Sequence, residues 1–119
     1  MITALLVLVG SGAGAITRLG VDTVVQSRRL GEFPLGTLVV NTSGCLLLGL
    51  LAGLEPSPDT MLVLGTATVG SYTTFSTWML ETQRPAEDGE RSLAWRNVLI
   101  SFGLGLAAVA LGRAVGRML

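Results

Sequence analysis

The residues best suited to chemistry lie in one uncharged stretch, where positions 68–77 read TVGSYTTFST. Eight of these ten residues are glycine or carry a hydroxyl group. Glycine and β-branched residues form helices weakly, so the stretch predicts a broken or distorted helix. Carbonyl groups released by such a break can coordinate a cation, and released N–H groups can face an anion. The alternative is a regular helix whose hydroxyls bond only to carbonyls of their own turns.

Two aromatic residues at the end of this stretch, Phe75 and Trp78, stand three positions apart and share a helical face. The edge of an aromatic ring carries partial positive charge, and the indole of Trp78 adds an N–H donor. Ring edges turned inward could therefore line the path of an anion. Without the neighbouring hydroxyls, simple packing would be the better explanation of the pair.

Asn41 is an amide within a long apolar segment, on one helical stripe with Thr37 and Gly44. An amide in hydrocarbon needs a hydrogen-bonding partner. Asn41 could donate hydrogen bonds to a passing anion or join two helices, and the sequence does not choose between these roles. Asn97 and Ser101, four positions apart, repeat the pattern nearer the C-terminus.

Arg18 lies in the last third of the first apolar segment. Its long stem could carry the guanidinium to the membrane interface. Alternatively, the charge could stand at the mouth of a vestibule and attract anions. Asp22 and Glu81 lie near the ends of their segments and could pair with arginines, although neither pair can be assigned.

Four apolar segments hold these residues, at about positions 2–25, 33–54, 60–81 and 93–113. A helix needs about 20 mainly apolar residues to cross a bilayer. The connections are short and polar, with Pro56 and Pro58 as a helix stop before the third segment and a connection over 83–92 after it. We therefore predict an all-α membrane protein of four transmembrane helices, the third broken near the midplane, forming a single channel domain over residues 1–119.

The composition supports lipid as the solvent. Half of the 119 residues are hydrophobic and only 13% are charged, against about 25% in a typical soluble domain. The net charge is zero, so no basic face for nucleic acid is expected. The chain has no histidine, the commonest general base and metal ligand, and its spans offer no nucleophile–base pair. An enzyme is accordingly the least expected function.

Small residues recur at a spacing that lets membrane helices approach closely. The pairs are Gly10 with Gly14, Gly49 with Gly53, and Gly112 with Gly116. Tight packing between subunits and ordinary membrane-helix composition explain them equally well. Four short helices enclose little volume, so we expect a partner subunit.

The arginines are unevenly divided between the two ends of the predicted helices. Five lie at the end with the first and third connections, and two lie near the C-terminus. The positive-inside rule then favours both termini outside the cytoplasm. Because the bias is modest, a dual-topology homodimer and an antiparallel pair with a related chain both remain open.

Three strings resemble the Fluc/CrcB family of fluoride channels: GAITR at 14–18, FPLGTLVVN at 33–41 and GSYTTFST at 70–77, followed by Glu81. The resemblance covers all four segments in order and length. It implies an antiparallel, dual-topology dimer in the bacterial plasma membrane, with two narrow pores. Such a channel would let fluoride leave the cytoplasm passively and so relieve its toxicity.

The resemblance also implies a structural sodium ion at the dimer interface. Backbone carbonyls of Gly70 and Thr73 would hold it, and Arg18 would be the family's helix-1 arginine. In the pores, Asn41 would be the amide and Phe75 the first aromatic, with Trp78 where a second phenylalanine usually stands. A track of hydroxyls would comprise Ser76, Thr77 and Ser101.

The chain departs from the family pattern just before the TTFST string. Ala67, Thr68 and Ser71 stand where the family usually has glycine, phenylalanine and glycine. These changes, with Trp78, put one pore in doubt and would suit a chain that pairs with a related, non-identical subunit. Four short apolar helices also suit two other functions, a small multidrug-resistance-type transporter and a non-conducting assembly subunit. The transporter depends on a glutamate in its first helix, which this chain lacks.

Overall fold

A computed structural model describes residues 1–28 and 31–119, and within these ranges the chain is helical without strands. Three long helices are α1 (Ile2–Ser27), α2 (Leu35–Leu54) and α6 (Arg91–Gly116). Each is long and apolar enough to cross a membrane. The predicted all-α class is therefore confirmed, and the described part of the chain provides three candidate membrane-spanning helices.

The segment between α2 and α6 is helical but interrupted. It comprises α3 (Pro58–Thr60), the π-helix η1 (Met61–Val69), α4 (Gly70–Tyr72) and α5 (Phe75–Glu87). Between α4 and α5 the backbone is extended, with φ −76° and ψ 160° at Thr73 and φ −145° and ψ 121° at Thr74. The interruption falls in the stretch where hydroxyl-rich sequence predicts a distorted helix.

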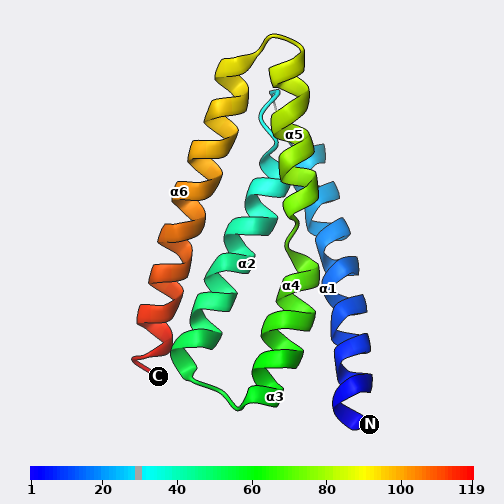
Figure 1. The fold of residues 1–119 in the computed structure, drawn as a ribbon, viewed down its shortest axis with the longest axis vertical. Helices are drawn as coiled ribbons and strands as arrows, with labels where there is room; N and C mark the ends of the chain where they lie inside the picture. The colour runs from blue at the N-terminus through cyan, green and yellow to red at the C-terminus, as the bar shows by residue number, and fades with distance from the viewer. Residues whose placement is uncertain (29–30) are drawn as a thin grey trace.

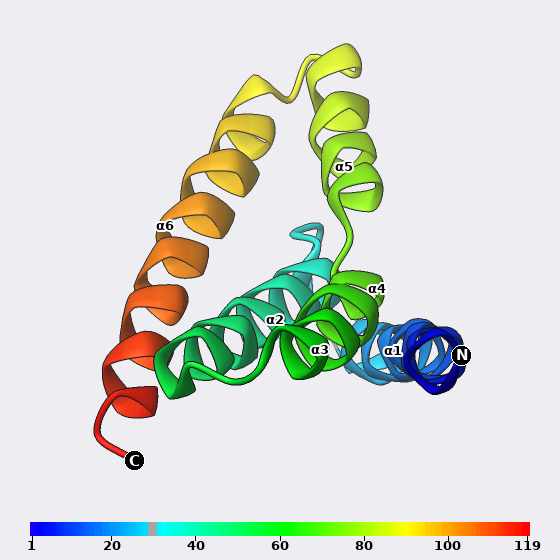
Figure 2. The same ribbon diagram turned by 60° about the horizontal axis from the view of Figure 1, so that its bottom comes forward.

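The helices run up and down along an elongated body of 49 × 30 × 24 Å, with both termini at the same end (Figure 1). Helix α2 lies centrally, packed most extensively against α6 and also against α1. Helix α1 contacts η1 and α4, whereas α5 contacts α6. Figure 2 shows that α5 leans away from α4 toward the top of α6. The interruption is therefore a bend between a part that packs against α1 and a part that packs against α6.

Several helix ends differ from the sequence prediction. Helix α2 begins at Leu35 rather than 33, because Pro34 adopts a non-helical ψ of 72°. Helix α5 runs through Pro85 to Glu87, so the predicted connection over 83–92 is wrong. The proline lacks an N–H, yet the turn closes around it because Asp88 N donates to Arg84 O at 3.0 Å. Gly89 then ends the turn with φ +87°.

The paired glycines are used inside one chain. A Cβ on Gly112 would meet the carbonyl oxygen of Leu46, and one on Gly116 would meet that of Leu50. Likewise, Gly14 faces the Thr68 carbonyl. These glycines therefore let α6 lie against α2, and α1 against η1, at backbone contact. Packing between helices of one chain accounts for these glycines, and a contact between subunits stays a prediction.

Candidate functional site

The interruption between α4 and α5 is tied to α2 by one side chain. Asn41 Nδ2 donates to Thr74 O at 2.9 Å, and Thr74 N donates to Asn41 Oδ1 at 2.8 Å. An amide side chain presents the same donor and acceptor as a peptide group, so it can replace the helical acceptor that the Thr74 N–H lacks and add a donor to the Thr74 carbonyl. Of the two roles open to Asn41, the structure shows the joining of two elements. The second hydrogen on Nδ2 is not used in this pair.

Carbonyls of the last turn before the interruption lose their usual helical partners, and Gly70 O and Thr73 O are among them. In a regular helix Gly70 O would accept from Thr74 N, and Thr73 O from Thr77 N. Here Thr74 N is bound by Asn41, and Thr77 N donates to Thr74 Oγ1 at 3.3 Å. Gly70 O instead has Thr73 Oγ1 at 3.4 Å, and Thr73 O has Arg18 Nη1 at 3.4 Å. Both remaining contacts are long, so lone pairs of both oxygens are open to another ligand.

These two carbonyls are the ones that the family resemblance assigns to sodium. Uncharged carbonyl oxygens suit a hard monovalent cation, and the described residues contain no cluster of histidine, cysteine or acidic side chains for another kind of metal site. The two carbonyls are therefore of the donor type that a sodium ion takes, and they form only part of a coordination shell. One chain supplies only two such oxygens, and Arg18 brings its own positive charge to one of them.

Hydroxyls gather at the first turn of α5. Thr74 Oγ1 donates to Thr77 Oγ1 at 3.1 Å and lies 3.5 Å from Ser76 Oγ. The same Thr74 side chain caps the helix by accepting from Thr77 N. The cluster thus lies at the positive end of the helix dipole. Ser76 and Thr77, two members of the predicted hydroxyl track, are together here.

A cavity of about 110 Å³ adjoins this cluster between α1, α2 and α5. Charged and polar side chains in its wall come from each of the three helices, and two apolar residues complete it: Arg18, Asp22, Thr37, Thr74, Thr77, Leu19 and Val40. Thr37 is only 2% exposed, and Asp22 Oδ1 is buried without a hydrogen-bond partner. The cavity has room for a few water-sized groups beside a guanidinium.

The two aromatic residues meet edge to face. The ring centroids of Phe75 and Trp78 are 5.7 Å apart with an interplanar angle of 65°. Phe75 is 70% exposed, so its ring projects from the chain at the start of α5. The Trp78 N–H points elsewhere, toward the Asn97 carbonyl at 3.5 Å. The indole donor is therefore directed at α6, through a contact as long as those of the two carbonyls.

Ser101 belongs to a different cluster from Ser76 and Thr77. Its hydroxyl donates to Asn97 Oδ1 at 3.2 Å, while Asn97 Nδ2 donates to Thr82 Oγ1 at 2.9 Å. Thr82 Oγ1 in turn donates to Trp78 O at 2.8 Å. Sequence reasoning missed Thr82, because one threonine in a helix gives no sign of an interhelical role. It also did not identify Asn97 as the centre of the cluster.

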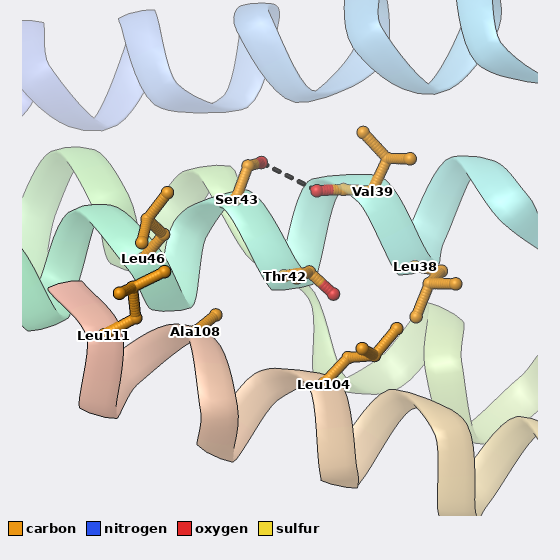
Figure 3. Close-up of a pocket in the computed structure, with 8 residues that line it drawn as sticks. All are labelled: Leu38, Val39, Thr42, Ser43, Leu46, Leu104, Ala108 and Leu111. Atoms are coloured by element: carbon orange, nitrogen blue, oxygen red, sulfur yellow. Dashed lines mark hydrogen bonds between the residues drawn. The ribbon is translucent and has the colours of Figure 1, made fainter.

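A larger groove of about 470 Å³ lies between α2 and α6, away from the interruption (Figure 3). Its wall is mainly aliphatic: Leu38, Val39, Thr42, Ser43, Leu46, Leu104, Ala108 and Leu111. Ser43 Oγ is occupied by Val39 O at 2.7 Å and by Tyr72 Oη at 2.8 Å. Thr42 Oγ1 is buried without a hydrogen-bond partner and is the open polar atom of this wall. One hydroxyl among aliphatic side chains is a poor replacement for the water around an ion. The smaller polar cavity is the better candidate despite its size.

The chain was compared with known proteins. Residues 5–113 match the family described as CrcB-like protein, Camphor Resistance (CrcB). A relative from Mycolicibacterium paratuberculosis, named fluoride-specific ion channel FluC 2, is 50% identical over 90% of this chain and 88% of its own. A Mycobacterium tuberculosis protein of the same name is 49% identical over 94% of this chain and 89% of its own. Fluoride-specific ion channel FluC 1 of Symbiobacterium thermophilum is 43% identical over 93% of this chain and 94% of its own.

Proposed function

The chain belongs to the CrcB family, and from that premise we propose that it is a subunit of a fluoride-selective channel in the bacterial plasma membrane. Family membership carries the proposal, since relatives that match nearly the whole chain are named fluoride-specific channels. The family is a channel family and not an enzyme family. Fluoride would move passively down its gradient and leave the cytoplasm, which relieves fluoride toxicity.

The proposed membrane arrangement has four spans. The interrupted segment from α3 to α5 would be the third, with Thr73 and Thr74 near the midplane. Non-helical backbone at that depth is tolerated only where protein or a water-filled cavity surrounds it. The pairing with Asn41 and the adjacent polar cavity support this placement.

The chemistry at the interruption suits a small, strongly hydrated anion. A selective site must replace the water that fluoride loses with hydrogen-bond donors, and it must be narrow. The unused Asn41 hydrogen, the hydroxyls of Ser76 and Thr77 and the positive end of α5 could supply the donors. The exposed ring of Phe75 could present its edge to the same path. Ser101 would become a further donor only if its hydroxyl turned away from Asn97 Oδ1.

We propose an antiparallel dimer for two reasons. The polar cavity that one chain forms beside the interruption is only about 110 Å³, and Phe75 projects outward from the chain. The partner could be a second copy or a related subunit. The names FluC 1 and FluC 2 among the relatives indicate that such chains occur as numbered variants.

A sodium ion would sit at the interface of this dimer. The carbonyls of Gly70 and Thr73 from both subunits would hold it, which would complete the set that one chain leaves short. When bound, sodium supplies a fixed positive charge that lowers the cost of an anion nearby. Arg18, beside Thr73 O, adds to the same positive potential.

The test is flux from liposomes containing the purified protein, measured with a fluoride electrode and a chloride electrode in parallel. Rapid fluoride efflux with chloride retained is expected. Equal efflux of both ions would reject selectivity. No efflux from the chain alone, restored when a related subunit is added, would support the heteromeric form.

A further inference from the structure

Asn97 is the most buried polar side chain of α6, with 1% of its surface exposed. Burying an amide in a membrane protein is unfavourable unless its hydrogen bonds are made. Asn97 makes them to α5 and to its own helix: Nδ2 donates to Thr82 Oγ1 at 2.9 Å, and Oδ1 accepts from Ser101 Oγ at 3.2 Å. The cost of burial is thus offset by bonds that fix α5 against α6.

These bonds close a ring that begins and ends on Trp78. Thr82 Oγ1 donates to the Trp78 carbonyl at 2.8 Å and accepts from Asn97 Nδ2. The main-chain carbonyl of Asn97 faces Trp78 Nε1 at a long 3.5 Å. The Asn97 side chain thus reaches the main chain of Trp78 through Thr82, and the Asn97 main chain lies beside the indole. Together these contacts hold Trp78 against α6.

The effect extends to the first residue after the interruption. Phe75 packs edge to face against Trp78, and its ring is otherwise largely exposed. An exposed phenylalanine has several rotamers available, and contact with a fixed neighbour selects among them. The orientation of the aromatic pair therefore depends on α6.

We propose that Asn97 is the positioning residue for Trp78, and through it for Phe75, and that it thereby sets the width of the aromatic part of the fluoride path. This inference rests on the proposed channel function for its effect on flux. Its effect on the indole can be measured whether or not the protein conducts.

The experiment uses the full chain in a Trp95→Phe background, where Trp78 is the only tryptophan. Asn97→Leu removes the amide at similar volume. Leucine keeps the main-chain carbonyl that faces the indole, so a change at the indole N–H reports movement of α5 away from α6. We expect the Raman vibration that reports hydrogen bonding at the indole N–H to move toward that of an unbonded indole. We also expect the ratio of fluoride to chloride flux to fall about tenfold, the size expected from loss of one or two buried hydrogen bonds.

Thr82→Val provides a second variant, because it deletes only the hydroxyl through which Asn97 reaches the Trp78 carbonyl. It should lower the flux ratio in the same direction, and the double variant should be no worse than Asn97→Leu alone. Thr23→Val is the matched control, since that hydroxyl bonds only to Leu19 O of its own helix at 2.7 Å. If Asn97→Leu does not fold, Thr82→Val and its indole signal decide the matter.

An unchanged indole signal and flux ratio in folded Asn97→Leu or Thr82→Val protein would overturn the inference. A changed indole signal with an unchanged flux ratio would also overturn it, because Asn97 would then support the fold without shaping the path. Absence of fluoride flux in the unaltered chain would instead count against the channel proposal. The indole measurement would still report on Asn97 in that case.

Discussion

Asn41 and Thr74 exchange two hydrogen bonds across 33 positions of sequence, one in each direction between the side-chain amide and the peptide backbone. The pair satisfies the Thr74 N–H, which has no helical acceptor because Thr74 lies between α4 and α5 with extended backbone. It also holds α2 against the first turn of α5. The interruption is therefore part of the packed structure of the chain.

Replacing Asn41 should show how much depends on this pair. Asn41→Leu leaves the Thr74 N–H without its partner, while the Thr74 carbonyl keeps its place as the N-cap acceptor of α5, so the change should cost roughly 1–3 kcal/mol of stability. Fluoride flux should fall at least about tenfold. Asn41→Asp keeps an acceptor for the Thr74 N–H but loses the donor. Its stability and flux should therefore lie between those of the unaltered protein and those of Asn41→Leu. Thermal unfolding in detergent and liposome flux measure these effects, with Thr17→Val as a control that loses only a bond to its own helix. Full flux in Asn41→Leu would argue against a role for this amide.

Arg18 offers a separate test of charge near the interruption. Its Nη1 lies 3.4 Å from Thr73 O, and its side chain forms part of the polar cavity. Arg18→Gln should reduce fluoride flux roughly two- to tenfold, because the positive potential is lost while a donor remains. Arg18→Lys should retain more of the flux. Equal flux in all three proteins would show that the guanidinium only anchors α1.

The sequence allowed a prediction of where the helix would be disturbed but not of what would hold the disturbance. The many hydroxyls around Thr73 and Thr74 can be read from the sequence, and they weaken the helix at those same positions by competing for its backbone hydrogen bonds. The hydrogen bonds between Asn41 and Thr74 join positions far apart in the sequence. An amide in an apolar stripe does not show its partner, so both roles of Asn41 stayed open. Helix α5 crossing Pro85 was missed for a similar reason, since contacts with α6 can maintain a turn that local preference would end.

For the site residues too, the sequence predicted groupings of neighbours in the chain but not groupings that depend on helix packing. Ser76 and Thr77 follow each other in sequence, and the structure keeps them together. Ser101 could be grouped with them only by resemblance, and its hydrogen bond goes to Asn97. Thr82 and Asp22 carried no pattern that distinguished them from other polar residues at helix ends. Their surroundings depend on how α5 meets α6 and how α1 meets α2.

The glycine contacts predict a contrast between two positions on α6. A methyl group at Gly112 would run into the Leu46 carbonyl, whereas one at Gly103 would meet nothing within 4 Å. Gly112→Ala should destabilise the protein by about 1–3 kcal/mol by forcing α2 and α6 apart. Gly103→Ala should be neutral or stabilising by up to about 1 kcal/mol, since alanine favours the helix. Thermal unfolding of both variants measures the difference. Equal stability would mean that α2 and α6 are not in backbone contact.

Sodium binding can be tested by linkage with Arg18. A ligand that binds only the folded dimer adds about 2.7 kcal/mol of stability at a hundred times its Kd. The unfolding temperature should therefore rise with sodium and not with N-methyl-D-glucamine at equal ionic strength. Arg18 competes for Thr73 O and repels a cation there, so Arg18→Gln should lower the sodium concentration needed for half of the shift. Thr17→Val should leave that concentration unchanged. A sodium effect insensitive to Arg18 would place the ion away from Thr73, and no sodium effect would remove the ion from the proposed dimer.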